Sequence, residues 1–233
     1  QASAGVATER SGGKRVSARQ AASGSIDLVL DHPSFFTFGV ENLDARLGGI
    51  FPQRLYIWAG YQGTGKTAFE LHNARKNAEQ GKRVVLVSLE MSPEQIWTRM
   101  ACGDLGVDFD SVLSGNVDTD TKSAVMNKQA ELGEMYEDFI SIYPAPMTLN
   151  DILSAAKTER PDIMWIDHSR LISGKPKDLN QYEWAMHIPT FLRQEVALMK
   201  GGGISVHLLM QLNRSSNKEN RRPNMHDLRL GGE

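Results

Sequence analysis

Eight residues, GYQGTGKT between Gly60 and Thr67, restrict the fold of this chain more than any other stretch. They fit the pattern G-x-x-x-x-G-K-[ST] at every position, which describes a phosphate-binding loop between a strand and a helix. In such a loop the glycines turn backbone N–H groups toward phosphate oxygens, the lysine reaches the terminal phosphates and the last hydroxyl ligates Mg²⁺. A chance match in a glycine turn is the alternative, but an apolar segment precedes the loop and a helical pattern follows it. The predicted nucleotide-binding residues are Gly60, Tyr61, Gln62, Gly63, Thr64, Gly65, Lys66 and Thr67.

Strand and helix patterns alternate along most of the chain. Short apolar runs predict strands at 54–59, 83–88, 139–143, 163–166 and 204–210. Helical patterns lie at 41–47, 66–80, 93–101, 121–135, 148–159 and 182–200, and Pro189 predicts a kink or a later start in the last of them. Continuously apolar strands separated by helices are typical of a single α/β domain, in which a mostly parallel sheet is covered by helices on both faces.

The two ends of the chain differ from its centre. Residues 1–25 are rich in Ala, Ser and Gly and carry several positive charges with little to bury, so we predict a flexible linker or tail, followed by the α/β domain at 26–233. The chain starts at Gln1 and stops at Glu233 within a glycine-containing segment. We therefore expect it to be part of a longer protein, truncated at the carboxyl end of the domain.

Composition limits the cellular setting and the partners. The formal net charge is -2, so nucleic-acid binding would depend on local clusters of Lys and Arg. The single cysteine, Cys102, excludes an internal disulfide, and the sequence has neither a signal peptide nor an apolar run long enough to cross a membrane. These features indicate a cytoplasmic protein without a membrane partner. Cys102 and His207, each in an apolar pattern, are predicted to be buried structural residues.

A phosphate loop needs an acidic residue on the other side of Mg²⁺, and Asp167 follows the apolar run 163–166. Its alternative role is to cap the next segment. No Asn-Lys-x-Asp segment that would select guanine occurs, so ATP is the predicted nucleotide. Glu90 lies just past the strand 83–88 and is the candidate base for the attacking water. It would equally suit the amino end of the helix that begins near Pro93, and spacing alone leaves both roles open.

Five segments, GYQGTGKT, VSLEMSPEQ, IDHSRLI, QLNR and RRPNMHDLR, occur in this order. Together they resemble the motor domain of DnaB-type hexameric replicative helicases, and the match runs from about Thr37 to the end of the chain. The resemblance implies a RecA-like P-loop fold, ATP and Mg²⁺ bound between neighbouring subunits of a ring, and hydrolysis that drives translocation along single-stranded DNA and unwinding of duplex. It also implies a primase and a helicase loader as partners of the full-length ring.

Carried over by motif, the resemblance assigns the site residues. Lys66, Glu90 and Gln211 would be catalytic, with Glu90 as the catalytic carboxylate and Gln211 as the sensor of the γ-phosphate. Thr67 and Asp167 would hold Mg²⁺. The resemblance thus favours catalysis over helix capping for Glu90.

The sequence departs from the family pattern in several places. Asp167-His168 resembles the phage primase-helicase branch, whereas Gln211 resembles the bacterial one, so a bacterial and a phage origin both stay open. Gln53 stands where the family commonly has glycine. Near the end, Leu230 replaces a polar glutamate of the DNA-backbone loop.

Two basic loops follow the strands that end at Asp167 and Gln211. In the family these loops face the central channel, where cations would follow the phosphates of single-stranded DNA; solvated mobile loops are the alternative. Neither loop contains an aromatic residue, so contacts to the DNA backbone are expected rather than base stacking. The predicted DNA-binding residues are Lys175, Lys177, Arg214, Lys218, Arg221, Arg222, Arg229 and Gly232.

Other classes of function share part of this pattern. A RecA-type recombinase or clock-type ATPase would use ATP to set assembly without unwinding, and an ATP-binding loader or adaptor would not need Glu90 for its function. The combination of SLEMS, QLNR and the later RRP segment favours the helicase. The arginine finger of the family lies beyond Glu233, so we expect the 233-residue chain to bind ATP but to hydrolyse it slowly.

Overall fold

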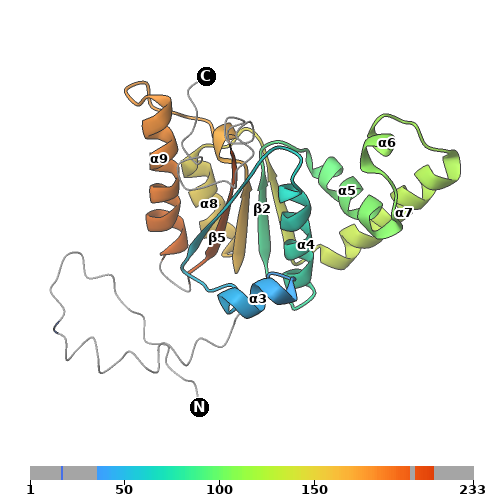
Figure 1. The fold of residues 1–233 in the computed structure, drawn as a ribbon, viewed down its shortest axis with the longest axis horizontal. Helices are drawn as coiled ribbons and strands as arrows, with labels where there is room; N and C mark the ends of the chain where they lie inside the picture. Colours follow the sequence, from blue (N-terminus) through green and yellow to red (C-terminus); the bar gives the residue numbers. More distant parts are fainter. Residues whose placement is uncertain (1–16, 18–35, 200–202, 213–233) are drawn as a thin grey trace, which may run out of the picture.

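The computed structural model describes Ser17 and residues 36–199 and 203–212, and one parallel sheet forms the centre of this part (Figure 1). Its five strands lie in the order β1-β5-β4-β2-β3, and every neighbouring pair is parallel. The strands are β1 (Leu55–Gly60), β2 (Val84–Ser88), β3 (Ile140–Pro144), β4 (Ile163–Asp167) and β5 (Ser205–Gln211).

Helices cover both faces of this sheet because its central strands are apolar on both sides. In β2, Val84 and Leu86 face the cluster that contains α4 (Lys66–Ala78), whereas Val85 and Val87 face the cluster that contains α8 (Leu149–Glu159). Side chains along a strand alternate between faces, so one strand contributes to both cores. The predicted α/β fold, a parallel sheet with helices on both faces, is confirmed.

The remaining helices have clear starts in the sequence. Ser92, Thr148 and Asn180 each form a capping box with the residue three positions later, which satisfies N–H groups that the first helical turn leaves free. The remaining helices are α3 (Glu41–Leu47), α5 (Pro93–Leu105), α6 (Phe109–Leu113), α7 (Thr119–Tyr136) and α9 (Gln181–Phe191), with a 3-10 turn at Ser169–Leu171. None of the described helices is long and apolar enough to span a bilayer.

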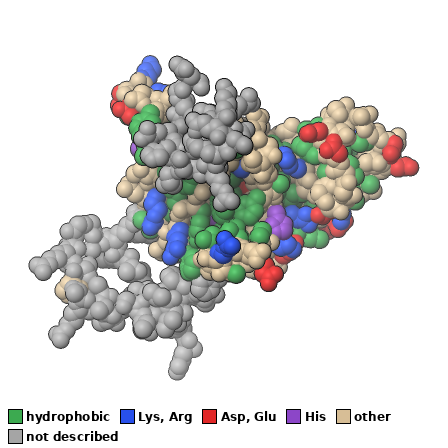
Figure 2. Space-filling view, in the orientation of Figure 1, with side chains coloured by type: hydrophobic (Ala, Val, Ile, Leu, Met, Phe, Trp, Pro, Cys, Tyr) green, Lys and Arg blue, Asp and Glu red, His purple; other side chains and the backbone are tan. Residues whose placement is uncertain are grey.

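Helices α5, α6 and α7 form a lobe that extends away from the sheet beyond α4 (Figure 1, green). Ile96 and Met100 of α5 and Val125 and Leu132 of α7 are buried in the same core as α4. The outer end of the lobe carries acidic side chains (Figure 2). The lobe is thus an outward continuation of one core.

Two details differ from the sequence predictions. Helix α6 was not predicted, because five residues are too few to show a helical period. A later start of the last helix is wrong: α9 begins at Gln181 and runs through Pro189. The irregularity follows the proline instead, since Leu192–Ala197 forms a π-helical turn.

Predictions for two buried residues are confirmed. Cys102 is buried within the core of α4 and α5. His207 is fully buried in β5, where its Nδ1 accepts a hydrogen bond from Trp58 Nε1 at 3.0 Å and its Nε2 lies 2.9 Å from Ser205 Oγ. Burial lowers the pKa of His207 to about 3, so the ring is neutral at physiological pH.

Candidate functional site

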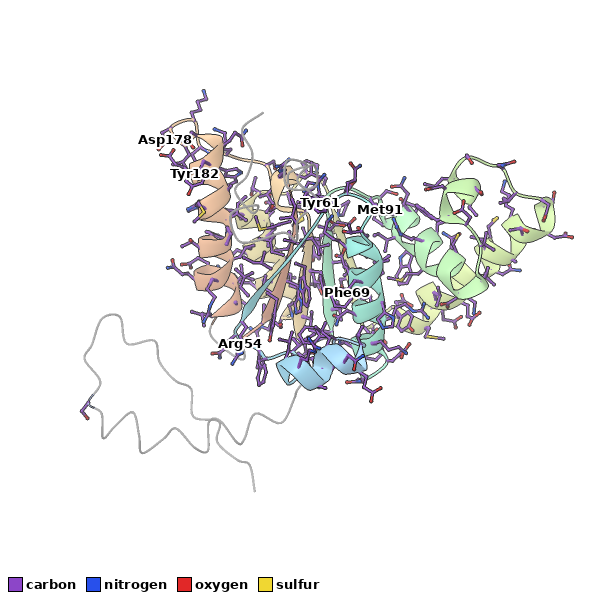
Figure 3. The ribbon with its side chains drawn as sticks, in the orientation of Figure 1. Arg54, Tyr61, Phe69, Met91, Asp178 and Tyr182 are labelled. Atoms are coloured by element: carbon purple, nitrogen blue, oxygen red, sulfur yellow. The ribbon has the colours of Figure 1, made fainter. Side chains whose placement is uncertain are left out.

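The polar residues predicted from the sequence gather at the carboxyl edge of the sheet. Parallel pairing puts Gly60 of β1 beside Gln211 of β5, and Ser88 of β2 beside Asp167 of β4. The chain leaves these strand ends into the phosphate loop and into the Glu90 segment. Figure 3 shows Tyr61 and Met91 at this end of the sheet and Arg54 at the opposite end.

A cavity of about 340 Å³ lies at this edge. A volume of this size falls within the usual range of small-molecule sites. The described residues that line it are Gln62, Gly63, Gly65, Lys66, Thr67, Glu90, Met91, Gln95, Arg99, Phe109, Leu113, Asp167, His168 and Gln211.

The phosphate loop has the backbone that anion binding needs. Gly63 and Gly65 have φ values of 79° and 86°, which residues with a Cβ rarely adopt. Gly65 is the N-cap of α4 and provides no side-chain cap, so the first N–H groups of the helix are directed at an incoming anion. Lys66 Nζ donates hydrogen bonds to the carbonyls of Gly60 at 3.1 Å and Tyr61 at 2.9 Å. A bound phosphate would take over these hydrogen bonds.

Thr67 and Asp167 meet across the boundary between α4 and β4. Thr67 Oγ1 donates a hydrogen bond of 2.7 Å to Asp167 Oδ2, and Asp167 is 4% exposed. Hydroxyl and carboxylate oxygens are the hard ligands that Mg²⁺ prefers. The residues present therefore fit this ion.

Glu70 adds a second carboxyl group that sequence reasoning missed. It lies one turn after Thr67, is 1% exposed, and its Oε2 is buried without a hydrogen-bond partner. Burial raises the pKa of Glu70 well above its ordinary value, and the charge of Asp167 and a hydrogen bond with Asp167 raise it further. The available signal was its position three residues after Thr67, on the same face of the helix.

Glu90 has the exposure that contact with water requires. Its side chain is 57% exposed, and its Oε2 lies 3.9 Å from His168 Nε2, too far for a hydrogen bond. Burial lowers the pKa of His168, against the charges of Asp167 and Glu90, so the imidazole carries little positive charge near neutral pH. The helix that follows is capped by Ser92 and has Glu94 in its first turn, so it does not depend on Glu90 for either feature.

The structure brings together the residues predicted to bind the terminal phosphates and the metal. Lys66, Thr67, Glu90, Asp167 and Gln211 all line the cavity. Gln211 is half-buried at the end of β5. Residues from four separate segments of the sequence therefore share one site.

The predicted DNA-binding residues do not line this cavity in the described part of the chain. Lys175 is half-buried, and its ammonium donates hydrogen bonds to the carbonyls of Pro176 and Leu179 in its own loop. Lys177 is exposed. The other predicted DNA contacts lie outside the described residues: Arg214, Lys218, Arg221, Arg222, Arg229 and Gly232.

One wall of the cavity was not anticipated. Gln95 and Arg99 lie four residues apart on α5, a spacing that puts them on one face. The Arg99 guanidinium lies 5.2 Å from the ring centre of Phe109, which comes from the unpredicted α6 together with Leu113. This wall combines apolar side chains with one delocalised cation, which suits a flat aromatic ring.

Comparison with known proteins agrees with this geometry. A family model described as "DnaB-like helicase C terminal domain" matches residues 36–233. The replicative DNA helicase DnaB of Rickettsia bellii (strain RML369-C) is 30% identical over 218 residues, which cover 87% of this chain and 43% of that protein. DnaB of Geobacillus stearothermophilus is 28% identical over 205 residues, covering 83% and 43%. The chain thus spans less than half the length of these relatives.

Solved structures show the same fold. A helicase-like ATPase domain superimposes with a TM-score of 0.73 at 23% identity, over 93% of this chain and 78% of that one. A DnaB-like replicative helicase, solved to describe its interactions with primase, gives 0.71 at 21% identity, over 94% and 54%. The expected RecA-like fold is confirmed. The chain belongs to the family of DnaB-like helicase C-terminal domains.

Proposed function

We propose that this chain is the ATP-driven motor of a replicative DNA helicase. In the full-length protein it binds and hydrolyses Mg·ATP between subunits of a ring, and the ring moves along single-stranded DNA and opens duplex. The observation that supports this best is the convergence of Lys66, Thr67, Glu90, Asp167 and Gln211 on one cavity.

Each of these residues has a chemical task in the proposal. The loop N–H groups and Lys66 bind the phosphates and stabilise the negative charge that develops during phosphoryl transfer. Thr67 and Asp167 hold Mg²⁺, which when bound neutralises phosphate charge. Glu90 accepts a proton from the attacking water. Gln211, at the end of β5, contacts the γ-phosphate and reports its presence to the segment that follows.

The wall formed by Arg99 and Phe109 gives the nucleotide base a place in this proposal. The guanidinium and the neighbouring apolar side chains of Met91 and Leu113 offer planar and apolar contacts close to the phosphate loop. No Asn-Lys-x-Asp segment is present to select guanine, which supports ATP.

DNA binding is proposed from the two basic loops rather than from the cavity. Lys177 is exposed in the first loop, and the charges of the second lie outside the described residues. Contacts to phosphates would make the affinity for single-stranded DNA fall steeply with salt. Because one structural neighbour interacts with primase, a primase is the proposed protein partner of the ring.

The full-length protein provides the test. We expect it to open a forked DNA duplex in the presence of Mg·ATP and to need a single-stranded arm for loading. ATP hydrolysis that DNA stimulates without any opening of the fork would instead support a RecA-type or clock-type ATPase. A protein that neither binds nor hydrolyses ATP would contradict the proposal.

A further inference from the structure

Glu70 is a buried carboxyl group that the proposed mechanism does not use. It is 1% exposed, and glutamate is almost never buried so completely unless it is paired. Its carboxyl lies within hydrogen-bonding reach of Asp167, while Oε2 is buried with no partner. A side chain this costly to bury requires a reason.

Three side chains of α4 make polar contacts with β4, at positions three residues apart. Thr67 and Glu70 both reach Asp167, and Asn73 Oδ1 accepts a hydrogen bond of 3.0 Å from Trp165 Nε1. Asn73 also donates to the carbonyl of Thr37 at 2.9 Å, so both ends of its amide are used in packing. Glu70 differs, because its contact is to the predicted Mg²⁺ ligand itself.

The Asp167 carboxylate is therefore held by two groups from one helix. Thr67 Oγ1 binds Oδ2 at 2.7 Å, and Glu70 approaches from one helical turn further along. A hydrogen bond between two carboxyl groups requires one proton, and complete burial favours the neutral form of Glu70. A neutral Glu70 can donate to Asp167 without adding a second negative charge to the site.

We propose that Glu70 is a positioning residue of the magnesium site, which donates a hydrogen bond to Asp167 and fixes the carboxylate in the orientation that holds the ion. The inference rests on the proposed binding of Mg·ATP at this cavity. Partners of metal ligands typically change metal affinity by about 10- to 100-fold when they are removed.

The test compares Glu70→Gln, which keeps a hydrogen-bond donor, with Glu70→Leu, which fills a similar volume without one. Binding of a fluorescent, non-hydrolysable ATP analogue to the 233-residue chain is measured in EDTA and across a Mg²⁺ titration. Binding of Mn²⁺ in the presence of the analogue is followed by electron paramagnetic resonance. Asn77→Ala is the matched control, since Asn77 lies on the same helix and is also buried with an unpartnered oxygen.

We expect Glu70→Leu to need about 10-fold more Mg²⁺ or Mn²⁺, with unchanged affinity for the analogue in EDTA. Glu70→Gln and Asn77→Ala should keep the metal dependence of the unmodified chain. Circular dichroism verifies that each variant is folded, and Glu70→Ala replaces the leucine variant if that one does not fold.

Three results would overturn the inference. The metal dependence of the leucine or alanine variant could equal that of the unmodified chain, or its affinity in EDTA could fall by the same factor, which would indicate a general structural role. A loss in Glu70→Gln as large as in Glu70→Leu would make Glu70 a direct ligand instead. If the unmodified chain shows no metal dependence at all, the proposed function fails together with the inference.

Discussion

At the scale of single residues, His207 links the core to pH. It is fully buried, and its ordinary pKa near 6.5 falls to about 3 in the folded protein. Between these two values the unfolded chain binds more protons than the folded chain, so stability decreases as pH falls from 6.5 toward 3. The hydrogen bond from Trp58 requires the neutral ring, because Nδ1 is its acceptor.

The first prediction concerns this histidine. Between pH 7 and pH 5 the protein should lose about 2 kcal/mol more free energy of unfolding than a His207→Gln variant, which has no group titrating at this position. Urea unfolding at the two pH values measures the difference. Other titrating groups, Glu70 and His168 included, are present in both proteins and cancel. Equal losses in the two proteins would show that the histidine is not buried in its neutral form.

Gln53 is a residue whose departure from the family pattern has a cost in the structure. Its φ of 59° lies in the left-handed region, which glycine adopts without strain. It is exposed, so its side chain contributes little buried surface. A Cβ added at Gly203 would clash with Gln53 Cγ, so the turn before β1 approaches the segment before β5 closely.

The second prediction follows from this backbone. Gln53→Gly should stabilise the protein by about 0.5 to 1 kcal/mol, because relief of the strain exceeds the added flexibility of the unfolded chain. Gln53→Ala keeps the Cβ and should give no such gain. Thermal unfolding of both variants measures this, and an equal gain in both would locate the effect in the side chain.

The residues of the phosphate loop and Asp167 could be predicted because fixed spacing in the sequence encodes their chemistry. Glu70 and Arg99 were missed because their roles depend on what faces them across the fold. Glu70 occupies an ordinary helical position in the sequence, and only the contact between α4 and β4 brings it to Asp167.

At the scale of elements, α5 is positioned by its amino-terminal cap. Ser92 Oγ accepts from the N–H of Gln95 at 3.3 Å, and the Gln95 side chain accepts from the N–H of Ser92 at 2.9 Å. This box starts the helix just after Glu90 and directs Gln95 and Arg99 to the cavity. Cap and site are therefore parts of one segment.

The third prediction tests the cap. Ser92→Ala should reduce the free energy of unfolding by about 1 kcal/mol. Ser123→Ala is the control, because Ser123 lies exposed inside α7 and its hydroxyl donates to the carbonyl of Thr119, and its effect should stay within about 0.5 kcal/mol. Chemical denaturation measures both. Equal effects would mean that the capping box does not contribute to stability.

The strands could be predicted closely because buried parallel strands are continuous apolar runs. Helix α6 could not, since its start depends on one side-chain hydrogen bond, from the N–H of Ser111 to Asp108 Oδ2 at 2.8 Å. The π-helical turn after Pro189 follows from how α9 packs, which sequence spacing does not specify.

At the scale of the whole molecule, the sequence indicated a parallel sheet but not the strand order β1-β5-β4-β2-β3. That order puts β5 between β1 and β4, so Gln211 ends between the phosphate loop and Asp167. The segment with the predicted DNA contacts begins shortly afterwards, at 213, where the described residues stop. The predicted contacts to nucleotide and to DNA are thereby adjacent in the chain.

The fourth prediction concerns this adjacency in the full-length ring. Gln211→Ala should leave ATP affinity nearly unchanged but reduce the stimulation of hydrolysis by single-stranded DNA. Nucleotide titration and steady-state hydrolysis with and without oligo-dT measure the two quantities separately. Stimulation equal to that of the unmodified protein would mean that Gln211 does not transmit the state of the nucleotide.

The central claim is that the cavity at the carboxyl edge of the sheet hydrolyses ATP with Glu90 as the base. The most direct measurement is single-turnover ATP hydrolysis by the full-length protein and its Glu90→Gln variant, at saturating Mg·ATP and single-stranded DNA. We predict that the variant binds ATP with similar affinity and hydrolyses it about 10²- to 10⁴-fold more slowly. Hydrolysis by Glu90→Gln at the rate of the unmodified protein would contradict the account.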